Sequence, residues 1–290
     1  MRMRRKHLII LSIAAFAAVL GCPTAGFASI LDMADTFAVL AGSTVTNTGS
    51  STVTGDIGVW EGSSVTGYGS ITHTGALHEA DLVAELAQSS LTTAYNGLAA
   101  MPFTSDLTGQ DLGGLTLTSG VYNYDSSAQL TGTLNLDAQG NDNAYWVFQI
   151  GTALTTASSA VVQLINPGLN NGFDDGVFWK IGSSATLGTG TAFEGNILAD
   201  QSITLNTGAS ISNGRALAKI GAVTMEANTI SNVCPPPNNG PGFSGGLVYD
   251  SQGNVVPIGP SQGSGSTATP EPSTLFLFGL GGLAAAFIKK

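Results

Sequence analysis

The chain has 290 residues, of which only 10% are charged, and it carries a formal net charge of −10. Typical soluble domains contain about 25% charged residues, so this composition favours uncharged β surfaces and tight turns over a helical enzyme. Between the two basic ends of the chain, the basic residues are Lys180, Arg215 and Lys219. An acidic body of this kind repels phosphate backbones, which excludes nucleic acid as a partner.

Residues 1–28 have the features of a secretory signal peptide. A basic start is followed by the apolar run Leu8–Leu20 and by small residues up to Ala28, which resemble a cleavage site. The apolar run is shorter than the roughly 20 residues of a membrane span. An imperfect lipobox ends at Cys22, so lipidation at this cysteine remains an alternative.

The body opens with short units in which an apolar residue is followed by Thr and then by Gly or Asn. These units are Val45-Thr46, Val53-Thr54 and Val65-Thr66. Period-2 alternation with immediate turn residues predicts short strands and tight turns. Residues 78–101 instead place apolar side chains at helical spacing and end at a proline. They predict one long helix that buries its apolar stripe along the strands.

Strand alternation resumes after Pro102. The predicted strands are Leu115–Thr118, Gly120–Tyr124, Thr133–Leu136, Tyr145–Ile150, Val161–Ile165 and Val177–Ile181. Two of them share an Ile-Gly pair, at Ile150 and Ile181, so we expect these strands to stack. Four aromatic residues are expected to fill the core, although surface platforms for sugars are an alternative. These are Trp146, Phe148, Phe178 and Trp179.

The stretch Ala185–Met225 contains one short strand unit three times. The copies recur at offsets of 18 and 20 residues and are separated by Gly, Asn and Thr. A strand unit at this spacing is typical of a β-solenoid, in which equivalent positions stack. Thr186, Thr204 and Thr224 should therefore form a column on one outer face. Four further threonines are expected to extend this column: Thr46, Thr54, Thr66 and Thr155.

The end of the chain changes in composition. Residues 235–269 are rich in Pro, Gly, Ser and Asn, which predicts an extended linker. The tripeptide Pro270-Glu271-Pro272 precedes the apolar segment Leu275–Ile288 and two lysines. This segment barely reaches the length of a membrane span, and the lysines would stop transfer on the cytoplasmic side.

No pattern for catalysis is present. The sequence contains no nucleophile elbow, phosphate-binding loop or zinc signature, so we expect no catalytic site, no metal and no cofactor. His73 and His78 could form a metal site with Glu79 or Asp81, but a solvated helix start explains these residues equally well. Residues 170–176 could chelate calcium, whereas a simple turn accounts for the same residues. Cys22 and Cys234 lack metal-ligand spacing, and we expect Cys234 to be an unreactive thiol.

Two parts of the chain resemble known families. The body from Phe37 to Cys234 is similar to the ice-binding-like domain family (domain of unknown function 3494). The similar stretches are FAVLAGSTVTNTG, GDIGV, the inserted helix and GNILADQSITLNTGASISNGRALAKIGAVT. The resemblance implies an all-β fold with one long helix over residues 29–234. That fold is an irregular right-handed parallel β-solenoid of triangular section with the α-helix packed alongside, and many members bind ice through a flat face.

Residues 270–290 resemble the PEP-CTERM sorting signal. This resemblance implies a Gram-negative bacterium, export, and processing by exosortase-type machinery. The protein would then reside in the cell envelope, on the outer surface or outside the cell. Before processing, its C-terminal segment would contact the membrane.

The family's ice-binding motif is loosely Thr-Ala/Gly-x-Thr/Asn, and this chain matches it in part. Residues 152–155 fit the motif, whereas 63–66 and 183–186 replace residues with Ser, and 201–204 keep only the final Thr. The ice-contacting candidates are Ser63, Thr66, Thr152, Thr155, Ser183, Thr186, Thr204 and Thr224.

A threonine column suits an ice surface for physical reasons. Stacked strands repeat at about 4.8 Å and alternate residues at about 6.7 Å, spacings comparable to the oxygen repeats of ice. The Thr methyl orders nearby water, the hydroxyl anchors it, and the side chain is stiff at χ1. Thr is also simply a good residue for an exposed β face. A structural or adhesive surface protein that binds exopolysaccharide is therefore the alternative function.

Overall fold

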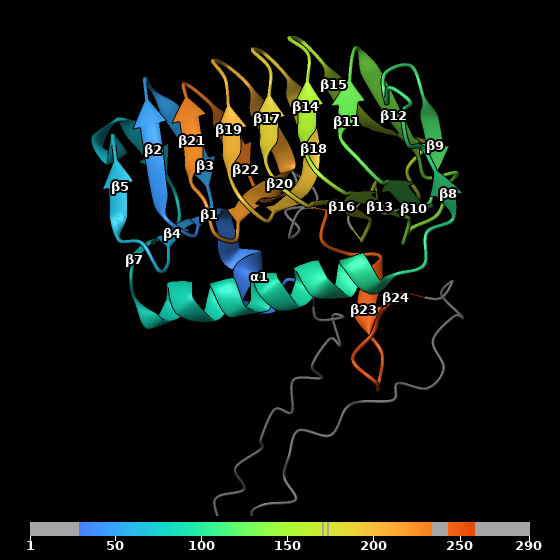
Figure 1. Cartoon of the computed structure of the whole chain (residues 1–290), viewed down its shortest axis with the longest axis horizontal. Coiled ribbons are helices and arrows are strands. Elements are labelled where there is room, and N and C mark those ends of the chain that lie inside the picture. The colour runs from blue at the N-terminus through green and yellow to red at the C-terminus, as the bar shows by residue number, and fades with distance from the viewer. Residues whose placement is uncertain (1–28, 170, 173, 234–242, 259–290) are drawn as a thin grey trace, which may run out of the picture.

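A computed structural model describes residues 29–169, 171–172, 174–233 and 243–258. The predicted signal peptide, Cys234 and the sorting signal lie outside these residues. The described chain winds through successive coils, and the strands of neighbouring coils pair in parallel (Figure 1). This arrangement confirms the predicted all-β solenoid with one long helix.

One face of the solenoid is a seven-stranded sheet, which we call the front face. Its order is β11-β14-β17-β19-β21-β2-β5, and the strands run side by side across Figure 1. Their bounds are β11 (Ala128–Leu130), β14 (Leu154–Thr156), β17 (Ala185–Leu187), β19 (Ile203–Leu205), β21 (Val223–Glu226), β2 (Thr44–Thr48) and β5 (Ser64–Thr66). The three repeat units of the sequence are the neighbouring strands β17, β19 and β21.

A 15-stranded sheet forms the other two faces. It turns from one face to the other within β18 (Ala192–Ala199) and β20 (Ser210–Ala218), where the register shifts beside Gly195. Gly195 has a φ of +99°, which a residue with a side chain rarely adopts. Each of these long strands therefore belongs to both faces.

The rear face contains the first halves of β18 and β20. Its other strands are β9 (Thr116–Thr118), β12 (Thr133–Asp137), β15 (Val161–Ile165), β22 (Thr229–Ser231), β3 (Ser51–Thr54) and β6 (Ile71–His73).

The helix face contains the second halves of β18 and β20. Its other strands are β8 (Ser105–Asp106), β10 (Gly120–Tyr124), β13 (Tyr145–Ile150), β16 (Gly176–Ile181), β1 (Phe37–Ala41), β4 (Asp56–Val59) and β7 (Leu77–Glu79).

Helix α1 (Leu82–Ala100) lies along this face (Figure 1). The predicted start at residue 78 is wrong, because residues 77–79 pair with β4 as strand β7. The helix begins after Asp81, whose carboxylate accepts a hydrogen bond from the Ala84 N–H at 2.9 Å, as expected of an N-cap. Its buried residues include Leu91, Ala94 and Leu98. They pack in a cluster with residues of the helix face such as Leu198 and Leu217.

The aromatic residues fill the interior. Trp146, Phe148 and Trp179 are inaccessible to solvent, and the Phe148 and Trp179 rings stack with centroids 3.9 Å apart. Phe148 pairs with Trp179 and Ile150 with Ile181 across β13 and β16, which confirms the predicted stacking. Phe178 is buried in the cluster under α1. The alternative of sugar platforms at these four residues is wrong.

The linker predicted from residue 235 is wrong for residues 243–258. Strands β23 (Leu247–Tyr249) and β24 (Val255–Pro257) form an antiparallel hairpin beside α1 (Figure 1). Leu247 and Val255 are buried against the helix, and Tyr249 Oη donates a hydrogen bond to the Ile30 carbonyl at 3.2 Å. Gly97 permits the contact, since a Cβ there would lie 2.5 Å from Val255 Cγ2. The folded domain therefore extends beyond residue 234.

Two short 3₁₀ helices complete the described elements, η1 (Asp32–Thr36) and η2 (Tyr68–Ser70). Within the described ranges, no helix has the length and apolar character needed to cross a membrane. The apolar segment Leu275–Ile288 lies outside those ranges.

Candidate functional site

The front face carries an outward row of threonines, one on each strand except β11, where the equivalent residue is Gln129. The strand register brings the row together: Gln129, Thr155, Thr186, Thr204, Thr224, Thr46 and Thr66. The preceding residue of each strand points inward, as Ala185, Ile203 and Val223 show by their burial. The alternation of apolar and Thr residues in the sequence therefore becomes a buried layer beneath a hydroxyl layer. We call this row the threonine row.

Two further rows, made mostly of Ser, Thr, Ala and Gly, accompany the threonine row. The second lies two residues earlier on each strand and contains Ser127, Ala153, Ser184, Ser202, Ala222, Thr44 and Ser64. The third lies where the chain enters each strand and contains Ser126, Thr152, Ser183, Gln201, Gly221, Ser43 and Ser63. Positions one, two and four of each four-residue motif thus face outward, and position three faces the core.

The structure places all eight candidate residues on the front face. Five lie in the threonine row: Thr66, Thr155, Thr186, Thr204 and Thr224. The other three, Ser63, Thr152 and Ser183, lie in the strand-entry row.

The extension of the column to Thr54 is wrong, because Thr54 pairs with Ser231 on the rear face. Apolar–Thr alternation is the same on both exposed faces, so it does not show to which face a strand belongs. Sequence reasoning also missed Gln129 and the second row, although the position two residues before each threonine carried the signal.

The threonine row is stiff and regular, and its threonines are partly or fully exposed to solvent. Neighbouring strands are about 4.8 Å apart and alternate residues about 6.7 Å apart, so the row extends for roughly 29 Å. No hydrogen bond joins the hydroxyls of its six threonines to another group among the residues that the structure describes. These hydroxyls are therefore available to water or to a solid surface.

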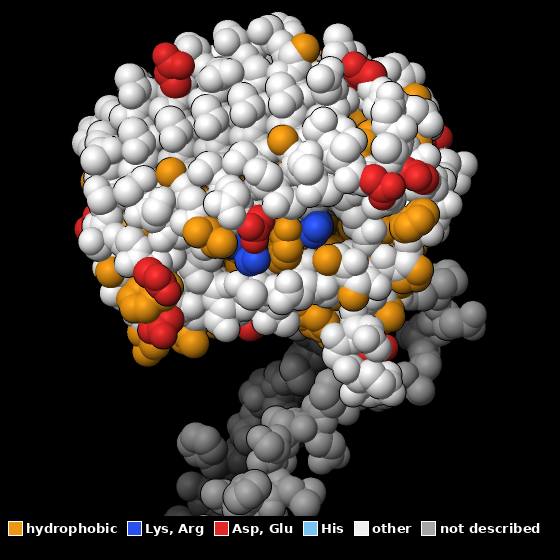
Figure 2. Space-filling view, in the orientation of Figure 1, with side chains coloured by type: hydrophobic (Ala, Val, Ile, Leu, Met, Phe, Trp, Pro, Cys, Tyr) orange, Lys and Arg blue, Asp and Glu red, His pale blue; other side chains and the backbone are white. Residues whose placement is uncertain are grey.

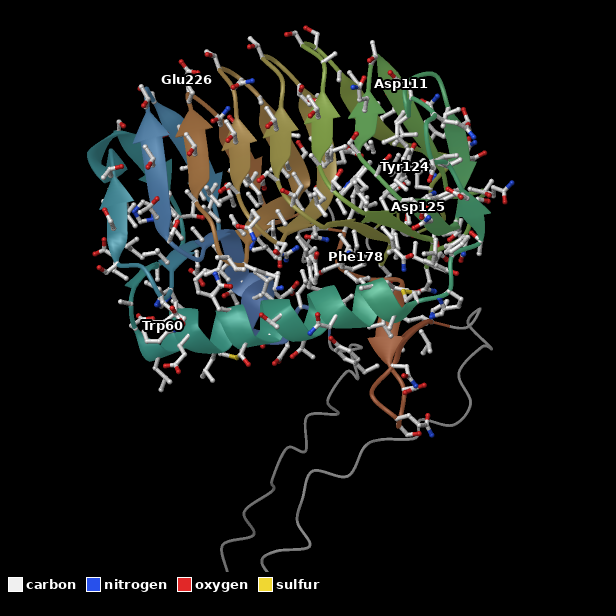
Figure 3. The ribbon with its side chains drawn as sticks, viewed as in Figure 1. Trp60, Asp111, Tyr124, Asp125, Phe178 and Glu226 are labelled. Carbon is white, nitrogen blue, oxygen red and sulfur yellow. The ribbon has the colours of Figure 1, made fainter. Side chains whose placement is uncertain are left out.

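Charged side chains lie at the margins of the front face. Figure 2 shows a surface over the seven strands that is almost free of charge. Glu226 and Asp111 lie at its upper rim (Figure 3). At the lower margin, Lys219 Nζ lies 2.9 Å from Asp200 Oδ1, and this hydrogen bond lowers the pKa of Asp200. Lys219 also lies over the Tyr95 ring at 4.2 Å, so these charges are held away from the rows.

Arg215, another basic residue of the body, has a structural role. Its side chain is fully buried, and its guanidinium donates to the Asp35 carbonyl and to Asn196 Oδ1 at 2.7 Å each. Arg215 Nη2 also lies 2.9 Å from the Asp35 carboxylate. The arginine thereby fixes η1 to the helix face and does not reach the front face.

The weaker sequence candidates are occupied by local contacts. His78 Nδ1 lies 2.8 Å from the Asp81 carboxylate, and His73 contacts Tyr68 and the Gly75 carbonyl. Over the described ranges, no three His, Cys, Asp or Glu side chains are grouped to hold a metal. Within the suggested calcium-binding stretch 170–176, Asp175 Oδ1 accepts from the Ala144 N–H at 2.8 Å. Burial raises the pKa of Asp175 to about 7.

Comparison with known proteins relates this architecture to one family. The family model described as ice-binding-like matches residues 39–231. The PEP-CTERM protein-sorting motif matches residues 268–290. An ice-binding protein of Nostoc sp. (strain HG1) is 53% identical over 234 residues, which are 81% of this chain and 85% of that protein.

Two solved structures of ice-binding proteins are similar. The protein from the Antarctic ascomycete Antarctomyces psychrotrophicus is 40% identical with a TM-score of 0.65, over 69% of this chain and 96% of that one. The protein from an Antarctic biological consortium is 39% identical with a TM-score of 0.65, over 78% of this chain and 96% of that one. The family match spans most of the solenoid, including α1 and all seven front-face strands. The chain belongs to the ice-binding-like family.

Proposed function

We propose that this protein is exported and binds ice through the front face. The observation that carries the proposal is the threonine row, in which six threonines and one glutamine occupy equivalent positions on seven stacked strands. The names of the similar proteins, which are ice-binding proteins, support the same function.

The row is pre-organised for a solid surface. Its β-branched side chains are stiff at χ1 and are fixed to a sheet backed by buried Leu, Ile and Val, so little entropy is lost when they contact ice. Each methyl orders nearby water, and each hydroxyl, lacking a partner within the described residues, anchors that water. A charged side chain would instead retain its own hydration shell, and charges lie only at the margins of the face.

The hairpin and the start of the described chain leave the front face free. Tyr249 of the hairpin bonds to Ile30 beside α1, and both therefore lie on the helix side. The C-terminal match to the PEP-CTERM motif supports export and exosortase-type processing. We propose delivery to the envelope or outer surface of a Gram-negative cell, which the same motif supports, and there the front face would be available to external ice.

A second candidate function is adhesion to exopolysaccharide, which the sorting motif favours. The burial of Trp146, Phe148, Phe178 and Trp179 removes these four residues as stacking platforms for sugars. A pull-down of the purified protein on the exopolysaccharide matrix of its own cells separates the two functions. Matrix binding that survives disruption of the threonine row would favour adhesion through another surface.

Ice-affinity capture of the purified protein tests the main proposal. The protein should be concentrated in a slowly grown ice hemisphere and depleted from the remaining liquid. Thr204→Tyr places a ring in the middle of the threonine row and should reduce capture to a small fraction of the wild-type value. Thr133→Tyr, an identical change on the rear face, is the matched control and should be captured like the wild type. Failure of the wild type to enter ice would refute ice binding.

A further inference from the structure

The rear face carries a second, smaller group of hydroxyl side chains. Thr72, Thr52, Thr229 and Ser210 occupy equivalent outward positions on β6, β3, β22 and β20. Two residues further along β3 and β22, Thr54 and Ser231 pair and form a second row. We call these six residues the rear array.

The rear array has the physical properties of the threonine row. Thr52, Thr72 and Thr229 are exposed, and among the described residues no hydrogen bond occupies their hydroxyls. Ser210 and Ser231 donate only weak bonds to nearby carbonyls, at 3.5 and 3.2 Å. The array has the same spacings of about 4.8 and 6.7 Å, because these follow from parallel pairing and the pleat.

The array ends sharply at β18, where the equivalent positions are Ala192 and Glu194. Beyond β18 the rear face changes character. Gln163 Nε2 donates to Asn135 Oδ1 at 2.7 Å, and Asn166 Nδ2 donates to Asp137 Oδ1 at 2.9 Å. These side chains satisfy one another, and Asp137 adds a charge. Only the part of the rear face from β6 to β20 therefore carries hydroxyl residues on adjacent strands without interruption, since Val161 and Ala192 separate Thr133 from Ser210.

We propose that the rear array is a second ice-contacting surface, separate from the front face. The proposal rests on the proposed function, since it assigns the same ligand to a second face of the same coils. The array contains no charge and no aromatic ring, and none of its residues lines the two cavities beside α1. It therefore lacks the largely apolar character of a site for a peptide or small molecule. A flat, stiff hydroxyl array at these spacings matches an ordered water surface.

The two surfaces are continuous along the chain but face different directions. Strand β2 leads directly into β3, and β21 into β22, so each of these coils contributes to both surfaces. The exposed carboxylate of Glu226 lies on the edge between them, where its hydration shell keeps ice away. Each surface therefore meets its own plane of ice, and one molecule can engage two planes or two neighbouring crystals.

Four variants test this inference by ice-affinity capture: Thr204→Tyr, Thr52→Tyr, the double variant and Thr133→Tyr. Thr52 lies between Thr72 and Thr229, so a ring there disrupts the centre of the rear array. Thr133 lies in the same outward column of the rear face but beyond β18. Thermal unfolding of each variant verifies that it is folded.

The result that supports a second surface is residual capture of Thr204→Tyr that falls by at least about tenfold when Thr52→Tyr is added. Thr133→Tyr added to Thr204→Tyr should leave this residual capture unchanged. Equal capture of Thr204→Tyr and the double variant would overturn the inference while leaving the front-face proposal intact. Absence of capture of the wild type would overturn both.

Discussion

The front and rear faces are built from the same coils, yet they present different chemistry to solvent. Both alternate buried apolar and exposed polar residues, and both stack at the same strand spacing. On the rear face, Gln163, Asn135 and Thr116 are linked by side-chain hydrogen bonds of 2.7 and 3.3 Å. The hydroxyls of the threonine row have no such partners within the described chain. From this difference we expect a polar β face to bind an external surface only where its polar groups are not already satisfied by one another.

The edge between the two faces holds both in register. Asn228 is buried there, and its side-chain amide donates to the carbonyls of Asn206 and Ala209 at 2.9 Å each. Its Oδ1 accepts from the Glu226 N–H, and its own N–H donates to Ser51 Oγ at 2.9 Å. One side chain thus satisfies the backbone of two successive turns.

Replacing Asn228 should have the largest effect on the fold. Asn228→Ala removes the side-chain partner of the Ala209 carbonyl and of the Glu226 N–H, while the Asn206 carbonyl keeps its bond from the Ala209 N–H. We therefore expect the free energy of unfolding to fall by about 2–4 kcal/mol. Urea denaturation monitored by circular dichroism measures this change. Asn206→Ala is the control at the same corner, one coil away. Within the described residues the Asn206 side chain makes no hydrogen bond, so this change should lower the free energy of unfolding by under about 0.5 kcal/mol. Equal effects of the two substitutions would show that Asn228 does not hold the edge.

The second prediction concerns the dependence of stability on pH, which arises in part from a carboxyl group of the rear face. Burial raises the pKa of Glu194, on the rear face, to about 7 from a usual value of 4.5. The unfolded chain releases this proton near pH 4.5, whereas the folded protein keeps it up to about pH 7. The folded state therefore binds more protons in this window, and its stability falls as the pH rises through it. Asp175, with a pKa of about 7 against 3.8, acts in the same direction.

Unfolding midpoints measured between pH 5 and pH 8 test this prediction. The protein should be more stable at pH 5, by about 1–2 kcal/mol for each carboxyl group. Glu194→Gln should remove part of the pH dependence, and Asp175→Asn should remove another part. Ice capture should not change over the same range, because no residue of the threonine row titrates. A rise in stability from pH 5 to pH 8 would contradict the burial argument.

The third and smallest prediction distinguishes the two groups of the threonine side chain. Thr186→Val keeps the β-branched shape and the stiff χ1, whereas Thr186→Ser keeps the hydroxyl but gains rotamer freedom. We expect Ser to reduce thermal hysteresis more than Val, with less than about 0.5 kcal/mol of change in stability for either. Thr133→Ser on the rear face should have no effect on hysteresis. Greater loss with Val than with Ser would assign the main role to the hydroxyl.

The comparison of the faces also shows what the sequence could reveal. The repeats at Thr186, Thr204 and Thr224 placed three coils of the threonine row correctly, because unbroken spacing of 18 to 20 residues determines the stacking. Thr54 was assigned to the wrong face because local alternation carries no information about which side of the solenoid a strand occupies. That assignment depends on turn lengths and on the pairing of β3 with β22.

Two other differences have physical causes in tertiary packing. The helix begins four residues later than its sequence pattern predicts, because β4 offers an unpaired edge to residues 77–79. The hairpin at 243–258 was hidden in a stretch rich in Pro and Gly. Its only signals were the apolar residues of Leu247–Tyr249 and Val255–Pro257, and Gly97 on the helix, which allows close approach. The sequence alone does not show that the apolar residues of the hairpin and Gly97 of the helix pack against each other.

The central claim is that the threonine row binds ice, and thermal hysteresis tests it most directly. The wild type, Thr204→Tyr and Thr133→Tyr are compared at equal protein concentration after each is shown to be folded. The wild type and Thr133→Tyr should give equal hysteresis, whereas Thr204→Tyr should lose nearly all of it, because the ring prevents close contact between the row and the ice plane. Wild-type hysteresis in Thr204→Tyr would contradict the claim.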